Sequence, residues 1–196
     1  MTRHTSTRRA FLAAGATTAA VSLAGCLGGD DGDDEPTGPK PDPIDLSGGK
    51  VDDQGGMIIG EHFGPNGQIF YVDNSPEGHD NPAWFHTLSV GLFPYYLAHE
   101  REGWTARAIY VTDYSTVDYE LATRDGQTYI STHTAADTFG DAESMSYVAD
   151  SGVHGGMGKE LIPFSDETDA ASFVETQGGR RLAFDDVDSE FLQSYR

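Results

Sequence analysis

Methionine and histidine are the side chains of this sequence that could bind a soft metal ion. Beyond residue 25 the chain contains three methionines and six histidines, and its single cysteine is Cys26. Thioether and imidazole groups remain as ligands for Cu(I) when no free thiol is present. Met57 and Met157 lie among glycines, which would let a thioether approach an exposed ion without bulky neighbours.

Each of these two methionines has a histidine close to it in sequence. His62 follows Met57, and His154 precedes Met157. A site of Met57 and Met157 with His154 or His62 would bind Cu(I) weakly and exchangeably, which suits a protein that must release its metal. The alternative is core packing for each methionine and a hydrogen-bonded or surface position for each histidine.

The remaining methionine and histidines show no metal-binding spacing. Met145 lies between expected strand residues, which favours a place in the core. His86 stands near the start of an expected helix and could face a site. The other three are expected to be structural or exposed: His79, His99 and His133.

Residues 1–25 have the pattern of a twin-arginine lipoprotein signal peptide. Arg8 and Arg9 form the twin-arginine pair, and the mildly apolar run 10–23 that follows is too short to span a bilayer. Residues 23–26, Leu-Ala-Gly-Cys, resemble a lipobox. We expect export by the twin-arginine route and a lipid on Cys26 that anchors the protein at the outer face of the cell membrane. The alternative is a signal cysteine without lipid.

The charge of the chain excludes some partners. The formal net charge is −20, and all 32 acidic residues follow residue 25. Such a surface repels nucleic acid and anionic lipid. Because the acids are dispersed and only three lysines occur, the composition is typical of a halophilic protein kept hydrated in concentrated salt.

The rest of the chain divides into a tether and one domain. Residues 26–50 are acidic, rich in proline and glycine, and nearly free of large apolar side chains, so we expect a disordered tether. Residues 51–196 have the length of one ordinary domain. Periodicity predicts helices over 82–100, with a kink at Pro94, and over 165–177, and strands over Gly67–Val72, Thr105–Thr112, 127–131, 144–149, 160–164 and 180–184.

This order of elements predicts an α+β fold. Two small ββαβ-like units, with approximate halves 51–115 and 116–196, would form one compact domain.

Three segments resemble the NosL family, the lipoprotein accessory factors of nitrous oxide reductase. They are GGMIIGEHFGPNGQI (55–69), the run from YVADS to GGMGKELIPF (147–164), and FVETQGGRRLAF (173–184). Together with residues 110–113, the resemblance extends from about Asp53 to Val187. It implies two related ββαβ units in a membrane-tethered copper chaperone that is not an enzyme. Such a chaperone would deliver Cu(I) for the copper-sulfide centre of nitrous oxide reductase in denitrification, so the implied partners are that reductase or its maturation machinery.

The family's ligand motifs are only partly kept. Its Cys-Gly-Met motif falls on 55–57, so Gly55 stands where the family has a cysteine. Its Gly-Pro-Met-Gly motif falls on 155–158, which keeps Met157 and replaces the proline by Gly156. The missing cysteine motivates an alternative function, a non-catalytic assembly scaffold or docking lipoprotein that has lost copper binding.

An enzymatic function is not expected from the motifs. The sequence has no pair of thiolates, no nucleophile elbow, no phosphate-binding loop and no zinc-ligand spacing. Its many acidic residues do not single out a catalytic pair.

Overall fold

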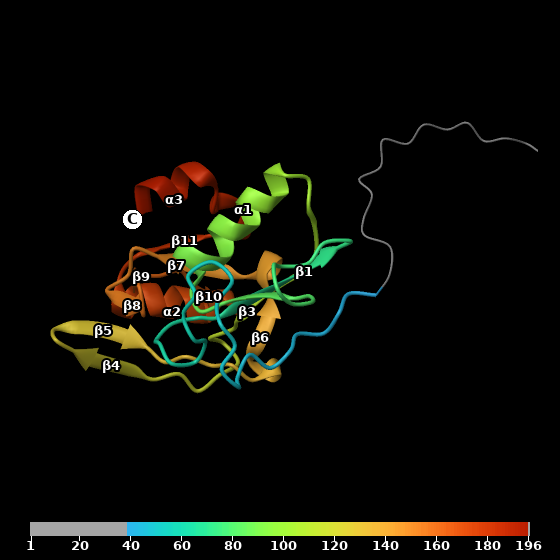
Figure 1. Ribbon diagram of the computed structural model, residues 1–196. Helices are drawn as coiled ribbons and strands as arrows, with labels where there is room; N and C mark the ends of the chain where they lie inside the picture. The colour runs from blue at the N-terminus through green and yellow to red at the C-terminus, as the bar shows by residue number, and fades with distance from the viewer. Residues whose placement is uncertain (1–38, 196) are drawn as a thin grey trace, which may run out of the picture. The chain divides into compact units, whose positions relative to one another are not determined.

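The computed structural model describes residues 39–195 (Figure 1). A first ββαβ unit consists of β1 (Gly67–Val72), β2 (Ala83–Phe85), α1 (Phe93–Arg101) and β3 (Thr105–Thr112). β1 is the middle strand and pairs antiparallel with β2 on one edge and β3 on the other. The predicted strands Gly67–Val72 and Thr105–Thr112 are therefore confirmed.

A second unit repeats this connectivity. It consists of β7 (Ser146–Ala149), β10 (Ile162–Phe164), α2 (Glu167–Gln177) and β11 (Arg180–Leu182). β7 lies between β10 and β11 and is antiparallel to both. The first strand of each unit is thus central, the second and third strands flank it, and a helix joins them. This arrangement confirms the predicted α+β fold of two ββαβ-like units.

Two hairpins extend the units and form a sheet of their own. β4 (Leu121–Arg124) and β5 (Gln127–Ile130) lie between the units in sequence, and β8 (Val153–Gly155) and β9 (Gly158–Lys159) lie between β7 and β10. β5 pairs in parallel with β8, which joins the hairpins. The segment 155–158 is therefore the turn of a hairpin.

Two further elements of the described chain lie outside the units and the hairpins, together with three short 3₁₀ turns at Ala136–Thr138, Ala142–Ser144 and Phe184–Asp186. β6 (Phe139–Asp141) pairs with the free edge of β3, and α3 (Ser189–Tyr195) ends the described chain next to α1. The sequence analysis assigned neither β6 nor α3.

The main hydrophobic core is shared by both units. Apolar side chains from β1, β2 and α1 pack with those of β7 and the C-terminal segment. Along β7, Tyr147 faces this core, whereas Val148 faces a second cluster that includes Phe164 and Phe173 beneath α2. Both faces of β7 are covered, which explains why its sequence is largely apolar rather than alternating.

The second predicted helix is confirmed, and a capping carboxylate and a glycine mark its ends. The Asp166 carboxylate accepts a hydrogen bond of 2.6 Å from the Thr168 N–H and so caps the start of α2. Gly178, with a φ of 75°, follows the last helical residue.

The prediction of a helix beginning at residue 82 is wrong at its N-terminal end. Ala83–Phe85 forms β2, because these residues alternate across an edge strand whose inner side pairs with β1. A π-helical turn at Leu88–Leu92 then precedes α1. This turn runs directly into α1, so Pro94 stands where the helix changes from π to α geometry.

The described part of the predicted tether lies against the domain. Leu46 is fully buried, the Tyr110 hydroxyl donates to the Pro41 carbonyl at 2.6 Å, and the Gln68 amide exchanges hydrogen bonds with the backbone of Ile44. The predicted signal peptide, Cys26 and the tether up to residue 38 lie outside the described residues. Within residues 39–195, no helix has the length and apolar character needed to cross a bilayer.

Candidate metal site

Two glycine-rich segments that are far apart in sequence lie against each other. The Gly156 N–H donates to the Phe63 carbonyl at 2.7 Å. A Cβ atom on Gly64 would lie 2.8 Å from the Gly155 Cα, and Gly64 has a φ of 104°, so the close approach requires glycine. The loop 52–64 and the turn of the β8–β9 hairpin, which carry the predicted ligands, meet at this junction.

His62 lies at the junction itself. A Cβ atom on Gly156 would lie 2.8 Å from the His62 Cβ, so His62 stands beside the turn that contains Met157. On its other side His62 lines an open pocket of about 280 Å³, whose other lining residues are Gly60, Glu61, Phe63, Arg124, Ser131 and Thr132. The structure therefore places His62 beside the turn that carries Met157.

The two predicted thioether ligands differ in exposure. Met157 occupies the hairpin turn and is 56% exposed. Met57 is half-buried, and its carbonyl accepts a hydrogen bond of 2.8 Å from the Asp52 N–H. Met157 can meet an ion or a partner directly, whereas Met57 lies on a turn anchored to Asp52.

His154 lies on β8, immediately before the hairpin turn of the junction. Successive side chains on a strand point to opposite faces. On β8 the side of Gly155 faces Glu160, and the ring of His154 lies 6.0 Å from the ring of Tyr129. Tyr129 in turn stacks on Phe63 of the loop 52–64 at 5.2 Å, so the ring of His154 is linked to the junction through Tyr129.

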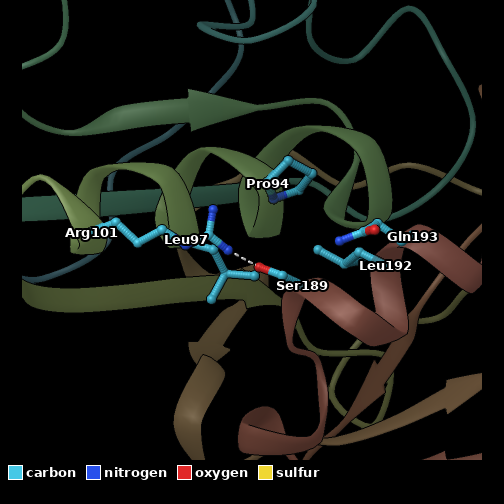
Figure 2. A pocket seen from close by; sticks show the side chains of 6 residues that line it. All are labelled: Pro94, Leu97, Arg101, Ser189, Leu192 and Gln193. Atoms are coloured by element: carbon cyan, nitrogen blue, oxygen red, sulfur yellow. Dashed lines mark hydrogen bonds between the residues drawn. The ribbon is translucent and has the colours of Figure 1, made fainter.

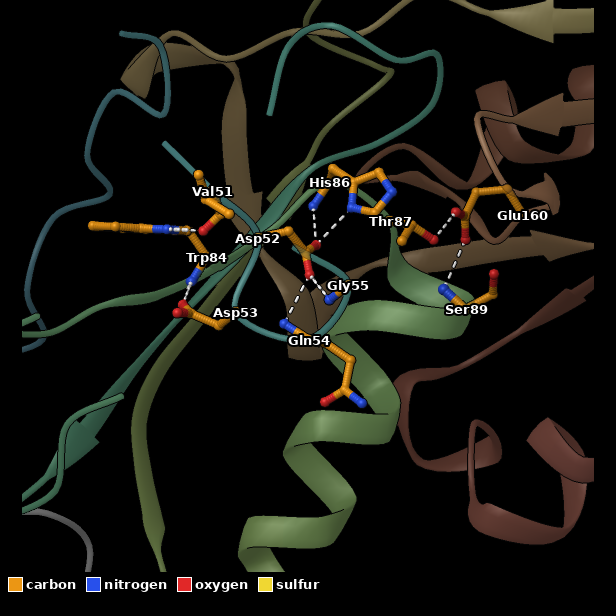
Figure 3. A network of polar contacts seen from close by, with 10 residues as sticks. All are labelled: Val51, Asp52, Asp53, Gln54, Gly55, Trp84, His86, Thr87, Ser89 and Glu160. Carbon is orange, nitrogen blue, oxygen red and sulfur yellow. Dashed lines mark hydrogen bonds and ion pairs between the residues drawn. The ribbon is translucent and has the colours of Figure 1, made fainter. Parts of the chain in front are cut away.

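A histidine and a carboxylate form a buried pair next to the junction. His86 is 3% exposed, and its Nδ1 lies 2.7 Å from Oδ2 of Asp52 (Figure 3). The same oxygen accepts the backbone N–H of His86 at 2.7 Å, and the other carboxylate oxygen accepts the N–H groups of Gln54 and Gly55. The ring of His86 lies 5.6 Å from that of His62, at an interplanar angle of 61°.

The environment of Asp52 determines its charge. Burial by itself would raise the pKa of Asp52, but hydrogen bonds from His86 and Gly55 hold that pKa below its ordinary value. An ionised carboxylate only accepts hydrogen bonds, so Nδ1 of His86 carries a proton that it donates to Asp52. Among residues 39–195, Nε2 of His86 is buried without a hydrogen-bond partner.

Gly55 faces this imidazole. A Cβ atom built on Gly55 would lie 3.3 Å from Cε1 of His86 and 3.4 Å from Oδ1 of Asp52. A side chain at position 55 would therefore point at the His86 ring.

A buried glutamate fixes the segment that follows His86. Glu160 is 1% exposed; its carboxylate accepts the Thr87 hydroxyl and, at 2.8 Å and 2.9 Å, the N–H groups of Ser89 and Leu161 (Figure 3). Burial raises the pKa of Glu160, although these hydrogen bonds act in the opposite direction. Glu160 also touches Gly155, so it ties the hairpin to the first turn after β2.

Sequence reasoning did not assign Asp52 and gave His86 only a position that could face a site. The two residues are 34 positions apart and form no local motif, so only the fold brings them together. Within residues 39–195, no group of three or more His, Cys, Asp or Glu side chains is arranged to hold a metal ion. A metal site here would need thioether ligands or a low coordination number.

A different pocket lies between α1 and α3 and has a volume of about 210 Å³ (Figure 2). The Arg101 guanidinium crosses it and donates to the Ser189 hydroxyl. The pocket contains none of the predicted ligands; its lining residues are Pro94, Leu97, Arg101, Ser189, Leu192 and Gln193. It is therefore separate from the candidate metal site.

Comparison with known proteins places this arrangement in a family. The NosL family model matches residues 43–192. The copper-binding lipoprotein NosL of Stutzerimonas stutzeri is 40% identical over 53 residues, which cover 27% of this chain and 28% of that relative's length. The crystal structure of the copper chaperone NosL from Shewanella denitrificans shares the fold, with a TM-score of 0.61 and 23% identity over 78% of this chain and 99% of that chain. Because the family model covers most of the sequence, the chain belongs to the NosL family.

Proposed function

We propose that this protein is a lipid-anchored, non-catalytic copper chaperone. It binds Cu(I) transiently through Met157 and His62, with Met57 and His154 as further ligands. The observation that carries this proposal is the junction of loop 52–64 with the β8–β9 turn, where His62 stands beside the turn that contains Met157. Thioether and imidazole are ligands that suit Cu(I), and an exposed thioether allows the ion to be passed on.

The acceptor that we propose is nitrous oxide reductase or its maturation machinery. Membership of the NosL family supports this assignment, as does the name of the relative from Stutzerimonas stutzeri, a copper-binding lipoprotein. In the proposed arrangement the signal peptide directs export by the twin-arginine route. The lipid on Cys26 then holds the protein at the outer face of the cell membrane. The acidic tether then gives the domain reach from that surface.

Competition for Cu(I) tests the copper function. The full chain carrying Cys26→Ser, which has no thiol, is titrated anaerobically against a chromogenic Cu(I) chelator. We expect this parent chain to withdraw Cu(I) from the chelator. We expect a fourfold variant, in which alanine replaces Met57, His62, His154 and Met157, to lose this ability. His99→Ala is the control, because His99 lies on α1 with its Nδ1 2.9 Å from the Tyr95 carbonyl. Failure of the parent chain to compete better than the fourfold variant would overturn the proposal.

The second candidate function is the assembly scaffold without copper. The glycine at position 55, where the family motif has cysteine, favours it. Deletion of the gene, followed by measurement of nitrous oxide reduction and of reductase copper content, separates the candidates. If the protein is a chaperone, the fourfold variant expressed in the deletion strain fails to restore the copper content of the reductase. If the protein is a scaffold, the same variant restores it fully.

A further inference from the structure

His86 has one nitrogen atom that the described structure leaves unused. Nε2 is buried and has no hydrogen-bond partner among residues 39–195, although the imidazole as a whole is 3% exposed. Burial of an unsatisfied polar atom costs free energy, and nearly all buried polar atoms in proteins have partners. We therefore expect Nε2 of His86 to bind a partner in the functional protein.

The orientation of the ring gives that nitrogen a specific character. Asp52 holds Nδ1–H at 2.7 Å, and Figure 3 shows the opposite edge of the ring turned away from the carboxylate. Metal-binding histidines commonly donate their second N–H to a carboxylate, which fixes the tautomer and makes the free nitrogen a stronger ligand. Nε2 of His86 meets these conditions without any further rearrangement of Asp52.

A second imidazole lies next to the first. The rings of His62 and His86 are 5.6 Å apart between centroids and meet edge to face. His62 also lines the open pocket that includes Phe63 and Arg124. His62 therefore lines the open pocket and also lies against the ring of His86.

The space beside His86 is kept open by Gly55. A Cβ atom on Gly55 would already lie 3.3 Å from Cε1 of His86, so any side chain there would crowd the imidazole. The absence of a side chain at position 55 therefore leaves the imidazole uncrowded on the side of Cε1.

We propose that Nε2 of His86 and the imidazole of His62 bind Cu(I) as a pair, with Asp52 as the positioning residue of His86. The assignment deepens the proposed copper-binding function and rests on it, because it names the ligands through which this chain holds copper without a thiolate. Imidazole is a suitable copper ligand, and two imidazoles can hold a monovalent ion at a low coordination number.

Competition with a Cu(I) chelator tests the pair, using the full chain with Cys26→Ser as the parent protein. We expect His86→Gln to lose affinity for Cu(I) about tenfold or more, and His62→Gln to lose a similar factor. His99→Gln is the matched control, because His99 is a half-buried imidazole whose Nδ1 bonds to the Tyr95 carbonyl at 2.9 Å. We expect no change in affinity for this control.

A measurement on the parent protein keeps the inference testable if His86→Gln does not fold. X-ray absorption of the Cu(I)-loaded parent should show scattering from two imidazoles, and ¹⁵N NMR should show the Nε2 resonances of both His62 and His86 moving on loading. Binding of Cu(I) with sulfur scattering alone and unchanged His86 resonances would overturn the pair while leaving the copper chaperone intact. Absence of Cu(I) binding by the parent would overturn both.

Discussion

One carboxylate oxygen of Asp52 accepts two hydrogen bonds from a single residue, His86. The backbone N–H and Nδ1 of His86 each lie 2.7 Å from Oδ2. The backbone bond satisfies a donor just beyond the end of β2, and the side-chain bond fixes the imidazole. The loop that begins at Asp52 and the segment that follows β2 therefore hold one another in place, and the ring cannot turn without losing its partner.

Asp52→Asn should weaken both the fold and copper binding. Asp52 has a lowered pKa, so its contribution to stability is full above the ordinary value of 3.8 and is lost as the pH falls through the lowered value. At pH 7 we expect the free energy of unfolding to fall by roughly 1–3 kcal/mol, because a charged acceptor of buried hydrogen bonds is lost. Chemical denaturation should show that the difference in free energy of unfolding between wild type and Asp52→Asn decreases below about pH 3.8.

The same variant distinguishes positioning of His86 from a purely structural role. We expect the affinity for Cu(I) to fall about 10- to 100-fold, the usual effect of losing the partner of a metal-binding histidine. In ¹⁵N NMR of the copper-free protein, His86 should change from a single Nδ1–H tautomer to a mixture. An unchanged tautomer with unchanged affinity would mean that Asp52 only supports the fold. Asp45→Asn, at an exposed carboxylate, is the control.

Gly55→Cys should raise the affinity for Cu(I) by about tenfold or more, because the new thiolate is a soft ligand beside His86. The gain should increase with pH up to the thiol pKa, ordinarily about 8.5. Gly55→Ser is the matched control, since its Cβ meets the same neighbours 3.3 Å and 3.4 Å away without offering a soft ligand. Equal affinities of the cysteine and serine variants would show that position 55 does not face the copper site.

Gly64→Ala should separate the two segments of the junction. Its Cβ would lie 2.8 Å from the Gly155 Cα, a backbone atom that cannot move aside cheaply. Gly78→Ala is the matched control, because Gly78 also has a positive φ, of 91°, but has open space around it. We expect Gly64→Ala to lower the free energy of unfolding by roughly 1–3 kcal/mol more than the control, and to weaken Cu(I) binding as well. Equal denaturation midpoints would contradict the close packing.

The sequence predicted the architecture well where local signals agreed with burial. The strand Gly67–Val72 and the helix expected over 165–177 form close to the predicted positions, and the repeated ββαβ order is present. The segment 83–85 was misassigned because the i, i+4 pattern around Trp84 resembles a helix, whereas pairing with β1 decides the conformation. The tertiary contact that decided this outcome carries no local signal.

The candidate site was predictable only in part. Glycines beside Met57 and Met157 pointed to the two loops that meet. The pairing of Asp52 with His86 spans 34 positions, and the approach of His62 to Gly156 spans 94, so neither follows from spacing along the chain. The burial of His86 in particular could be learned only from the folded structure.

Met145 and Met157 should respond to substitution in opposite ways. Met145 is 4% exposed and belongs to the main core, whereas Met157 is 56% exposed. We expect Met145→Ala to lower the free energy of unfolding by roughly 2–5 kcal/mol and to leave the affinity of the folded protein for Cu(I) unchanged. Met157→Ala should change stability by less than about 0.5 kcal/mol and weaken Cu(I) binding. Denaturation and chelator competition on both variants would reveal a reversed pattern if the assignment were wrong.

Glu160→Gln should reveal a buried carboxyl group that resists ionisation. Burial raises the pKa of Glu160 above the ordinary value of 4.5, and the hydrogen bonds from Thr87, Leu161 and Ser89 offset this only in part. Between the ordinary and the raised pKa the unfolded chain has already lost the proton that the folded protein keeps. The free energy of unfolding must therefore decrease as the pH rises through this window.

The glutamine variant cannot ionise at position 160, so its free energy of unfolding lacks this pH-dependent contribution. We expect the stability of the wild type relative to Glu160→Gln to be greatest near pH 4 and to fall as the pH rises towards 7. Denaturation of both proteins at fixed high salt measures the difference, in which contributions from the other acidic groups cancel. Asp166 offers the opposite case, since the hydrogen bond from Thr168 lowers its pKa. The difference in free energy of unfolding between wild type and Glu160→Gln could instead stay constant with pH. Glu160 would then ionise in the folded protein at its ordinary pKa. The hydrogen bonds from the Thr87 hydroxyl and the Ser89 N–H would in that case fully compensate the burial of the carboxylate.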